Sequence, residues 1–458
     1  MWAAEPNTLV AAANPELSRA VGKVSDPDPA TGRSEVLEES AMSPRSSHPV
    51  TVTAHRRPVA SRPLAFWLVA GAFAVTMFGT TLPTPLYVLY QQELGFAEEM
   101  LTVIFAVYAA GVLAALLLFG RASDQLGRRR VLLIGLTCAA LSTVAFLLDH
   151  GLALLIVGRV LSGLSAGIFT GTATAALMDL AGTGQGRRAT LVATASNIGA
   201  LGLGPLVAGI LAQLAPLPLR LPYWVDLVLI LLAILAVWAM PETVEVPEHP
   251  RLRINRPDLP PPVRPVFVRA ATAGFAGFAV LGLFTAVVPS FLLDLLHEPS
   301  HVLSGAVVFT MFAASALGQV ILARRFGHRA LAAGCVALIA GMGLLAAGLV
   351  TTSLALVIGA AIIAGLGQGL CMRAGLEAVN TQAPAERRAG VASTFFIVMY
   401  IGISLPVIGV GIAASGLGLQ SAGIAASIAV AAIAAIALAT TLIPARTRPT
   451  RAAVPVSA

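Results

Sequence analysis

The sequence predicts an all-α polytopic membrane protein with about twelve transmembrane helices in two sets of six. Three observations predict this fold. Hydrophobic residues make up 57% of the 458 residues and charged residues only 11%, about half the charged share of a typical soluble domain. Apolar stretches close to the length of a membrane span recur between Pro63 and Pro444. A six-span pattern occurs once on each side of a polar, proline-rich segment.

Residues 1–62 precede the first apolar segment. They are rich in Ala, Pro, Ser, Glu and Arg, show no apolar periodicity and contain no signal-peptide hydrophobic region. We expect a disordered cytoplasmic N-terminal tail. Translation from Met42 is an alternative that would leave a short basic leader, and the sequence leaves Met1 and Met42 both open.

The first set of spans lies in residues 63–240 and the second in residues 267–443. Each apolar segment is long enough to cross a bilayer as a helix. Between the sets, residues 241–266 hold eight prolines and several arginines, a composition that predicts a cytoplasmic linker. Residues 444–458 form a second cytoplasmic tail. The expected spans are 64–90, 99–119, 131–149, 152–179, 189–213, 223–240, 267–293, 302–323, 331–350, 354–373, 389–414 and 421–443.

The position of the positive charges predicts the topology. Arginines cluster after the even-numbered spans and in the C-terminal tail, whereas the connections on the other side contain only Arg220. Since short cytoplasmic loops are enriched in Lys and Arg, we expect both termini in the cytoplasm and a multi-pass protein of the plasma membrane. The net charge of +7 therefore reflects topology, and we expect no nucleic-acid partner.

The two halves repeat each other. The segment Gly163–Gly167 in the fourth span corresponds to Gly365–Gly369 in the tenth, and Gly127 after the second span corresponds to Gly327 after the eighth. This pattern indicates duplication of a six-span unit.

The first span of each half carries proline near its outer end, Pro83 and Pro85 in one and Pro289 in the other. Paired helix breaks point to a substrate cavity or gate, although a tolerated kink would leave the same pattern.

The loop after the second span carries the most specific motif. Gly120, Asp124, Gly127, Arg128 and Arg129 match the pattern G-x-x-x-D-x-x-G-R/K-R/K, which resembles the signature loop of the major facilitator superfamily. The resemblance covers 64–443 and implies a major facilitator fold: an N-terminal six-helix bundle at 63–240 and a C-terminal six-helix bundle at 267–443, around a central cavity. It also implies a conformational-switch role for the loop, with Asp124 near Ala389 and Gly390 at the start of the eleventh span. Gln125 departs from the basic residue usual in that family.

The fifth span contains Gly204, Pro205 and Gly209. These residues resemble part of the G-P-x-x-G-G motif of the drug/proton antiporter branch, while Ala200 and Ala208 replace glycines. The resemblance favours an antiporter, whereas helix packing alone would also explain the glycines.

Intramembrane charges are the candidates for proton coupling. Arg159 lies well inside the fourth span and begins a stretch similar to the R-x-x-x-G motif of the family, whose arginine is linked to proton coupling. Asp226 and Asp294, near the outer ends of the sixth and seventh spans, are the best candidate carboxylates. Structural pairing is the alternative for Arg159.

Polar residues inside the spans are candidates for the substrate cavity: Thr84, Tyr87, Tyr108, Asn197 and Gln368. Any one of them could instead make an interhelical hydrogen bond. Because they are few, the predicted pocket is mainly apolar and suits lipophilic substrates.

The function that these observations favour is secondary active transport: proton-coupled efflux of small lipophilic compounds by alternating access. A proton-linked importer of a metabolite is an alternative, and a non-transporting sensor or lipid-handling protein is one of another class. The three cysteines lie apart in apolar runs, and no P-loop or clustered catalytic set occurs. We therefore expect no enzyme activity, cofactor or metal, and a monomer with a small-molecule substrate, protons and the lipid bilayer as partners.

Overall fold

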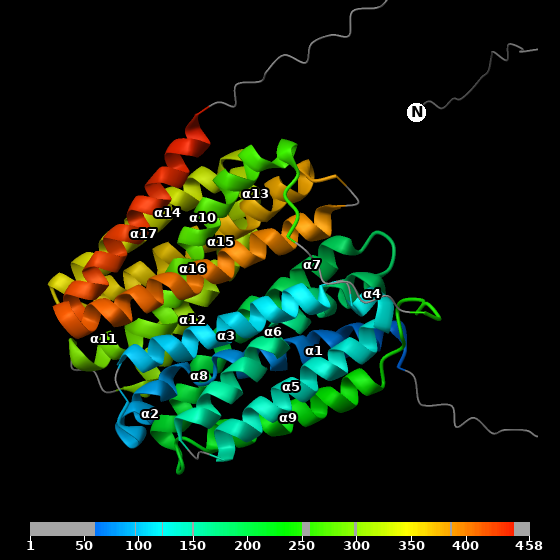
Figure 1. Cartoon of the computed structure of the whole chain (residues 1–458), viewed down its shortest axis with the longest axis horizontal. Helices are drawn as coiled ribbons and strands as arrows, with labels where there is room; N and C mark the ends of the chain where they lie inside the picture. Colours follow the sequence, from blue (N-terminus) through cyan, green and yellow to red (C-terminus); the bar gives the residue numbers. More distant parts are fainter. Residues whose placement is uncertain are drawn as a thin grey trace, which may run out of the picture. The chain divides into compact units, whose positions relative to one another are not determined.

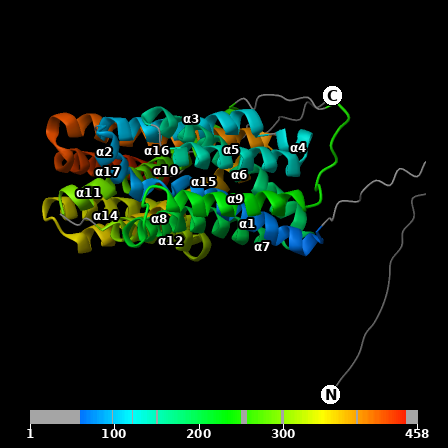
Figure 2. The ribbon, with the colours of Figure 1, turned by 90° about the horizontal axis from the view of Figure 1, so that it is seen from below.

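The computed structural model describes residues 60–96, 98–120, 122–148, 151–249, 257–296, 300–384 and 387–443. The predicted tails lie almost wholly outside these residues. All regular structure in the described ranges is helical. The long helices run side by side in a common direction in two perpendicular views (Figure 1, Figure 2), as expected of a membrane bundle.

The first six spans follow one another without a domain insertion. The first span is broken into α1 (Arg62–Thr81), the short turn η1 (Thr84–Leu86) and α2 (Tyr87–Leu94), and the fifth is a continuous run of three segments. A short helix, α4, follows the second span. In chain order the remaining elements are α3 (Glu98–Phe119), α4 (Ala122–Leu126), α5 (Arg128–Leu148), α6 (Leu152–Ala181), α7 (Gly186–Thr194), η2 (Ala195–Gly199), α8 (Ala200–Leu214) and α9 (Leu221–Trp238).

The second six spans begin inside the segment predicted as linker. A turn, η3 (Pro261–Val263), leads into the seventh span at Arg264, because Pro265 fits the first turn of a helix. The tenth span extends past its predicted end to Gln382. The elements are α10 (Arg264–Gly282), η4 (Leu283–Val287), α11 (Val288–Asp294), α12 (His301–Leu317), η5 (Gly318–Leu322), α13 (Ala323–Phe326), η6 (Gly327–Arg329), α14 (Ala330–Val350), α15 (Leu354–Gln382), α16 (Arg388–Leu417) and α17 (Leu419–Leu442).

Eleven helical runs in the described residues are long and apolar enough to cross a membrane, and one of them spans 50 residues, His301–Val350. A straight helix of that length would be about 75 Å long, more than twice the hydrocarbon thickness of a bilayer. The run turns back at Gly327, whose φ is +50°. It therefore contains two crossings, and the described chain has twelve.

The packing against α15 confirms the turn. Gly365 and Gly369 of α15 lie against Met311 and Ser315 of α12, in the same order along both helices. By contrast, α14 meets α15 in reverse order: Gly334 lies against Cys371, Gly341 against Ala364 and Gly348 against Val357. Hence α12 and α14 run in opposite directions.

The same contacts recur in the first half. Gly163 and Gly167 of α6 lie against the backbones of Tyr108 and Val112 of α3, as their counterparts in α15 lie against α12. The turn glycines also match, because Gly127 has a φ of +95°. The repeat seen in the sequence is thus a repeat of packing, in which glycines let helix backbones approach closely.

Each half buries its own apolar core. The buried members of one cluster all lie between Ala65 and Met240, and those of the other between Ala273 and Ala437. Figure 1 shows the two groups, with α1, α5, α6 and α9 in one and α10, α14, α15 and α17 in the other. The architecture is two six-helix bundles.

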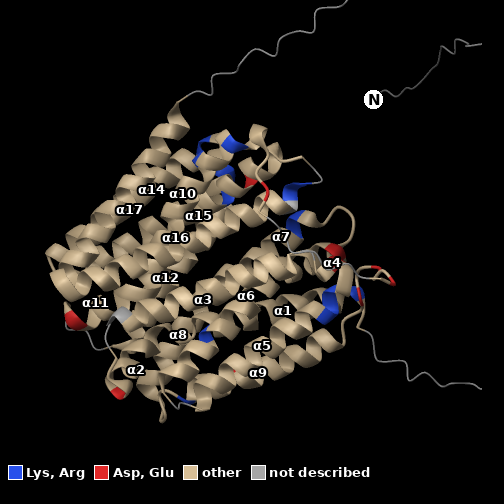
Figure 3. Cartoon of the chain, viewed as in Figure 1, with Lys and Arg blue, Asp and Glu red and all other residues tan. Residues whose placement is uncertain are grey.

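Lys and Arg residues gather at one end of the molecule (Figure 3). We call this end the basic face; its described arginines include Arg62, Arg128, Arg129, Arg130, Arg187, Arg188, Arg264, Arg269, Arg324, Arg325, Arg329, Arg373, Arg387 and Arg388. The other end, which holds Arg220 and the end of α11 at Asp294, is the opposite face. The charge asymmetry predicted from the loops is present along the helix axes.

The two bundles meet closely toward the opposite face. In the pair α8 and α12, Gly209 lies against the carbonyl of His301 and Gly305 against the carbonyl of Pro205. In the pair α3 and α16, Gly411 lies against Thr102. At each of these three glycines the partner helix leaves no room for a Cβ atom.

Both predicted helix breaks are present. The helix α1 ends at Thr81, just before Pro83 and Pro85, and a π-helical segment, η4, directly precedes the stretch containing Pro289. Proline lacks the N–H that would continue the helix ladder, which explains why both irregular turns occur there. The two breaks border the space between the bundles.

Candidate functional site

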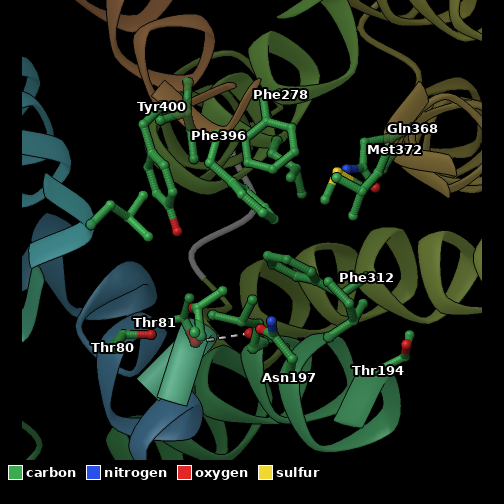
Figure 4. A pocket seen from close by; sticks show the side chains of 18 of the residues that line it. Thr80, Thr81, Thr194, Asn197, Phe278, Phe312, Gln368, Met372, Phe396 and Tyr400 are labelled. Carbon is green, nitrogen blue, oxygen red and sulfur yellow. Dashed lines mark hydrogen bonds between the residues drawn. The ribbon is translucent and has the colours of Figure 1, made fainter. Parts of the chain in front are cut away.

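A cavity of about 460 Å³ lies between the two bundles. It runs from Thr84 and Arg159 in the half near the opposite face to Gly120 and Arg373 near the basic face. Figure 4 shows Thr80, Thr81 and Asn197 on one side and Phe278, Phe396 and Tyr400 facing them. Because the bundles are in close contact on the opposite side, the cavity opens toward the basic face.

The cavity wall is mainly apolar. Its aromatic residues are Phe105, Tyr108, Phe278, Phe312, Phe396 and Tyr400, joined by leucines, isoleucines and Met372. The polar groups are mostly hydroxyls and amides, and no Asp or Glu occurs among the described lining residues. The only two charged side chains among them are Arg159 and Arg373.

Four of the five predicted cavity residues line this space: Thr84, Tyr108, Asn197 and Gln368. Gln368 is buried and accepts a hydrogen bond from the Ser315 hydroxyl. The break after α1 places Thr84 at the wall. The nearby Thr81 hydroxyl donates to the carbonyl of Leu201 at 2.8 Å and ties α1 to α8.

Tyr87, the fifth, does not line the cavity. Its side chain is only 2% exposed and lies behind the wall, with its ring centroid 5.0 Å from the Arg159 guanidinium carbon. The turn at η1 rotates the chain so that Tyr87 faces α6 instead of the cavity. A break in a helix changes which side chains face inward, and a sequence read as one continuous span does not show this change.

Arg159 sits at the inner end of the cavity. Its side chain is 2% exposed, and Nη1 donates to the carbonyl of Thr80 at 2.8 Å. That carbonyl is available because α1 ends at Thr81, and the last carbonyls of a helix lack helical partners. Four aromatic rings surround the guanidinium within 6 Å: Tyr87, Phe105, Tyr108 and Phe146.

Two donors of Arg159 are unused. Nε and Nη2 have no hydrogen-bond partner in the described part of the chain. The Tyr87 ring centroid lies 5.0 Å from the guanidinium carbon, and the Tyr87 hydroxyl has no hydrogen-bond partner among the described residues. None of the ion pairs between described residues includes Arg159.

Asp226 is buried away from the cavity. Its Oδ2 accepts from the Thr143 hydroxyl at 2.7 Å, and Oδ1 has no partner within the described residues. Gly79 of α1 lies against the carboxylate, and only a glycine leaves room for it there. The Asp226 side chain therefore projects from α9 into the contact with α1 and α5.

Asp294 is exposed at the end of α11 on the opposite face, beside Gln91 and Gln92. It is outside the cavity and the bundle interior. Of the three predicted coupling residues, the structure thus brings only Arg159 to the cavity.

The loop motif forms a network at the basic face. Asp124 pairs with Arg128 at 2.6 Å, and Arg128 also reaches Asp179 at the end of α6 at 3.2 Å. Glu242, which follows the sixth span, accepts from the backbone N–H groups of Arg128 at 2.7 Å and Arg129 at 3.3 Å. A carboxylate at this position stabilises the start of α5.

Two features of this network differ from the sequence prediction. The Asp124 carboxylate is bound to Arg128 in its own loop rather than to the start of α16, because the bundles are separated by the cavity on this side. Glu242 was missed. An acid just after a span could have been recognised as a possible helix cap, but nothing in the sequence shows which helix it caps.

Gly204, Pro205 and Gly209 lie at helix crossings. Gly204 packs against the carbonyl of Phe78 in α1, whereas Gly209 and Pro205 contact the start of α12. This segment is therefore a packing element that joins the two bundles.

The sequence analysis also missed the aromatic residues of the second bundle. Phe278, Phe312, Phe396 and Tyr400 face the cavity, but an aromatic residue in an apolar span can equally face lipid. No signal in the sequence separates the two orientations.

The described residues contain no group of three or more His, Cys, Asp or Glu that could hold a metal ion.

Comparison with known proteins identifies similar sequences over parts of the chain. The triacylglyceride transporter of Mycolicibacterium smegmatis is 30% identical over 159 residues, 34% of this chain and 28% of that protein. The multidrug resistance protein MdtL of Klebsiella pneumoniae is 30% identical over 155 residues, 33% and 38% of the two chains. The quinolone resistance protein NorA of Staphylococcus aureus is 26% identical over 147 residues, 32% and 37%. The chain thus aligns with about a third of each relative's length.

Solved structures share the fold over a longer stretch. A bacterial homolog of the human lysosomal transporter Spinster has a TM-score of 0.66 at 16% identity, covering 83% of this chain and 96% of that one. A POT family transporter bound to a thioalcohol-conjugated peptide has a TM-score of 0.67 at 13% identity, covering 82% and 95%. The model of the Major Facilitator Superfamily matches residues 69–407. With its twelve helices in two repeated bundles around one cavity, the chain belongs to the Major Facilitator Superfamily.

Proposed function

We propose that this transporter exports small lipophilic compounds by alternating access, coupled to protons, as a monomer of the plasma membrane with both termini in the cytoplasm. The observation that carries the proposal is the cavity of about 460 Å³ between the bundles. Its volume suits a drug-sized molecule. Its aromatic and aliphatic wall would bind apolar surface and offers few polar groups to a sugar or another highly hydroxylated solute.

The proposed direction of transport rests on a cytoplasmic position for the basic face. The arginine-rich connections lie at that face, and short cytoplasmic loops of membrane proteins are enriched in Lys and Arg. The cavity is open to that face, so compounds would enter from the cytoplasm or the inner leaflet. Release to the outside requires the contacts between α8 and α12 and between α3 and α16 to separate.

The relatives support the substrate class. MdtL and NorA are named for resistance to drugs, and the mycobacterial relative for transport of triacylglycerides. Drug resistance and triacylglyceride transport both support an apolar cargo for this chain. Because each alignment covers about a third of the relative, the substrate class remains our proposal for this chain.

Asp226 is the residue that we propose to exchange the proton. It is a carboxyl buried among three helices of one bundle, with a single hydrogen bond from Thr143. A change in its protonation would change the charge buried against Gly79, directly before the Thr80 carbonyl that holds Arg159. The proton and the cavity would thus be coupled through the end of α1.

Transport in proteoliposomes tests the proposal. Purified protein is reconstituted with its orientation determined, and a lipophilic fluorescent dye is followed with and without an imposed pH gradient. We expect dye to move from the basic-face side to the other side, with protons moving the opposite way. Movement of dye and protons together would indicate the import alternative, and movement of neither, with any lipophilic dye, would overturn the proposed function.

A further inference from the structure

The buried guanidinium of Arg159 lacks a counter-charge in the structure. It donates once, to an uncharged carbonyl, and two of its donors have no partner among the described residues. An unpaired charge in a low-dielectric interior is costly and is normally paired or turned toward a site that supplies the missing partner. We propose that this partner is the substrate, and that the cavity binds lipophilic organic anions with the anionic group at Arg159. This inference rests on the proposed transport function and narrows its substrate class.

No nearby acid competes for Arg159. The described lining contains no Asp or Glu, and the buried Asp226 is held by Thr143 and faces Gly79. The second lining arginine, Arg373, already has a partner, because it pairs with Glu377 at 3.7 Å and its side chain is 41% exposed. Arg159 is therefore the uncompensated positive charge of the cavity.

The surroundings of Arg159 leave its donors available. Aromatic faces attract the guanidinium at centroid distances of 5.0 to 5.8 Å, but they accept no ordinary hydrogen bond from its N–H groups. A planar carboxylate or sulfonate can take two parallel N–H donors from one side of a guanidinium.

The rest of the cavity fits an apolar body attached to that group. Phe105 and Tyr108 line the cavity as well as surrounding Arg159, so the anion site is continuous with the apolar wall. Beyond them lie Leu201, Phe278 and Phe396. A lipophilic cation would meet a positive charge without a balancing acid, and a neutral compound would leave the buried donors unused.

Three probes of one shape and different charge test this inference: naphthoate, naphthamide and naphthylmethylammonium. Their binding to the full-length protein in nanodiscs is measured by calorimetry. We expect naphthoate to bind at least about tenfold more tightly than naphthamide, since a charge-assisted pair of hydrogen bonds is worth that factor or more. The ammonium probe should bind most weakly.

Three variants locate the effect. Arg159→Gln should remove the preference for naphthoate over naphthamide, and Arg159→Lys should keep part of it. Arg373→Gln, which removes the other arginine of the same cavity, should keep the full preference. If Arg159→Gln does not fold, the inference is still tested by the order in which the three probes bind to the unchanged protein and to Arg159→Lys.

The inference is overturned if naphthamide or the ammonium probe binds as tightly as naphthoate, if none of the three binds, or if Arg159→Gln retains the preference. Export of a neutral dye in proteoliposomes separates this failure from that of the proposed function. A protein that exports the dye but shows no anion preference is a transporter with a different substrate class.

Discussion

At the scale of single residues, Arg159 links the sequence to the cavity. Its position inside an apolar span made it a candidate for a cavity-facing or paired charge, and the structure shows a cavity-facing charge with one carbonyl partner. The rings around it could not be predicted, because Tyr87, Phe105 and Phe146 come from three other spans. A sequence read span by span does not show which helices are neighbours.

Replacing Arg159 by methionine should abolish transport but not destabilise the protein. The change removes an unpaired buried charge and keeps apolar volume, a replacement that is often neutral or stabilising. We expect transport to fall at least tenfold and the melting temperature, measured by scanning fluorimetry in detergent, to stay within about 3 °C of the unchanged protein. A large drop in melting temperature would show that Arg159 mainly holds α6 to α1.

Asp226→Asn should separate substrate movement from proton movement. Asparagine has the same shape and can keep the bond from Thr143, but it carries no exchangeable charge. Uphill export driven by a pH gradient should be lost, while exchange of labelled for unlabelled substrate without a gradient should continue. Asp294→Asn, on the exposed end of α11, is the matched control and should change neither activity. Loss of both activities in Asp226→Asn would assign the residue to packing.

At the scale of helices, glycine positions determine which spans lie together. Gly163 and Gly365 occupy equivalent places in α6 and α15, and each lies against a carbonyl of a parallel neighbour. The sequence identified these glycines through the internal repeat. It did not show which face of each helix meets lipid, because Ala, Val and Leu occur on all faces, and a helix that is apolar all round has little amphipathic pattern.

Gly163→Ala should destabilise the first bundle. A methyl group there would overlap the carbonyl of Tyr108, so α3 and α6 would have to separate. Overpacking of this kind typically costs about 1–3 kcal/mol, and we expect a lower melting temperature and a lower yield of folded protein. Gly171→Ala in the same helix is the control, since a methyl group at Gly171 meets no atom within 4 Å. If Gly163→Ala and Gly171→Ala lowered the melting temperature equally, the close contact between α3 and α6 at Gly163 would not be important for stability.

At the scale of the whole molecule, most of the fold could be predicted and about half of the site could not. Span length, arginine placement and the repeat led to twelve helices in two sets, and Gly127 and Gly327 have the turn conformations expected of them. Helix rotation and the break after α1 determine where side chains point, so the sequence could not show that Tyr87 lies behind the cavity wall or that Asp226 and Asp294 lie outside the cavity. The conformation, with one side closed and the other open, leaves no mark in a single sequence.

Asp124→Asn should change the rate of transport more than the stability of the protein. The Asp124–Arg128 pair is on the surface, with the Asp124 side chain 54% exposed, and such pairs contribute at most about 1 kcal/mol to folding. Since the network lies where the bundles are apart, we expect a several-fold slower transport cycle with unchanged yield of folded protein. Glu377→Gln, which removes a similar exposed pair with Arg373, is the control. Equal transport in Asp124→Asn and the unchanged protein would exclude a switching role for the loop.

At the contact between α8 and α12, which helps to close the opposite face, Gly209 and Gly305 lie against main chain. At these two positions no swinging side chain separates the helices. Whole helices must tilt apart before a molecule can leave on that side, so the rate of release is set by the stiffness of the two bundles. A methyl group at Gly305 would then act as a wedge that props the outer exit ajar and lets solute leak through.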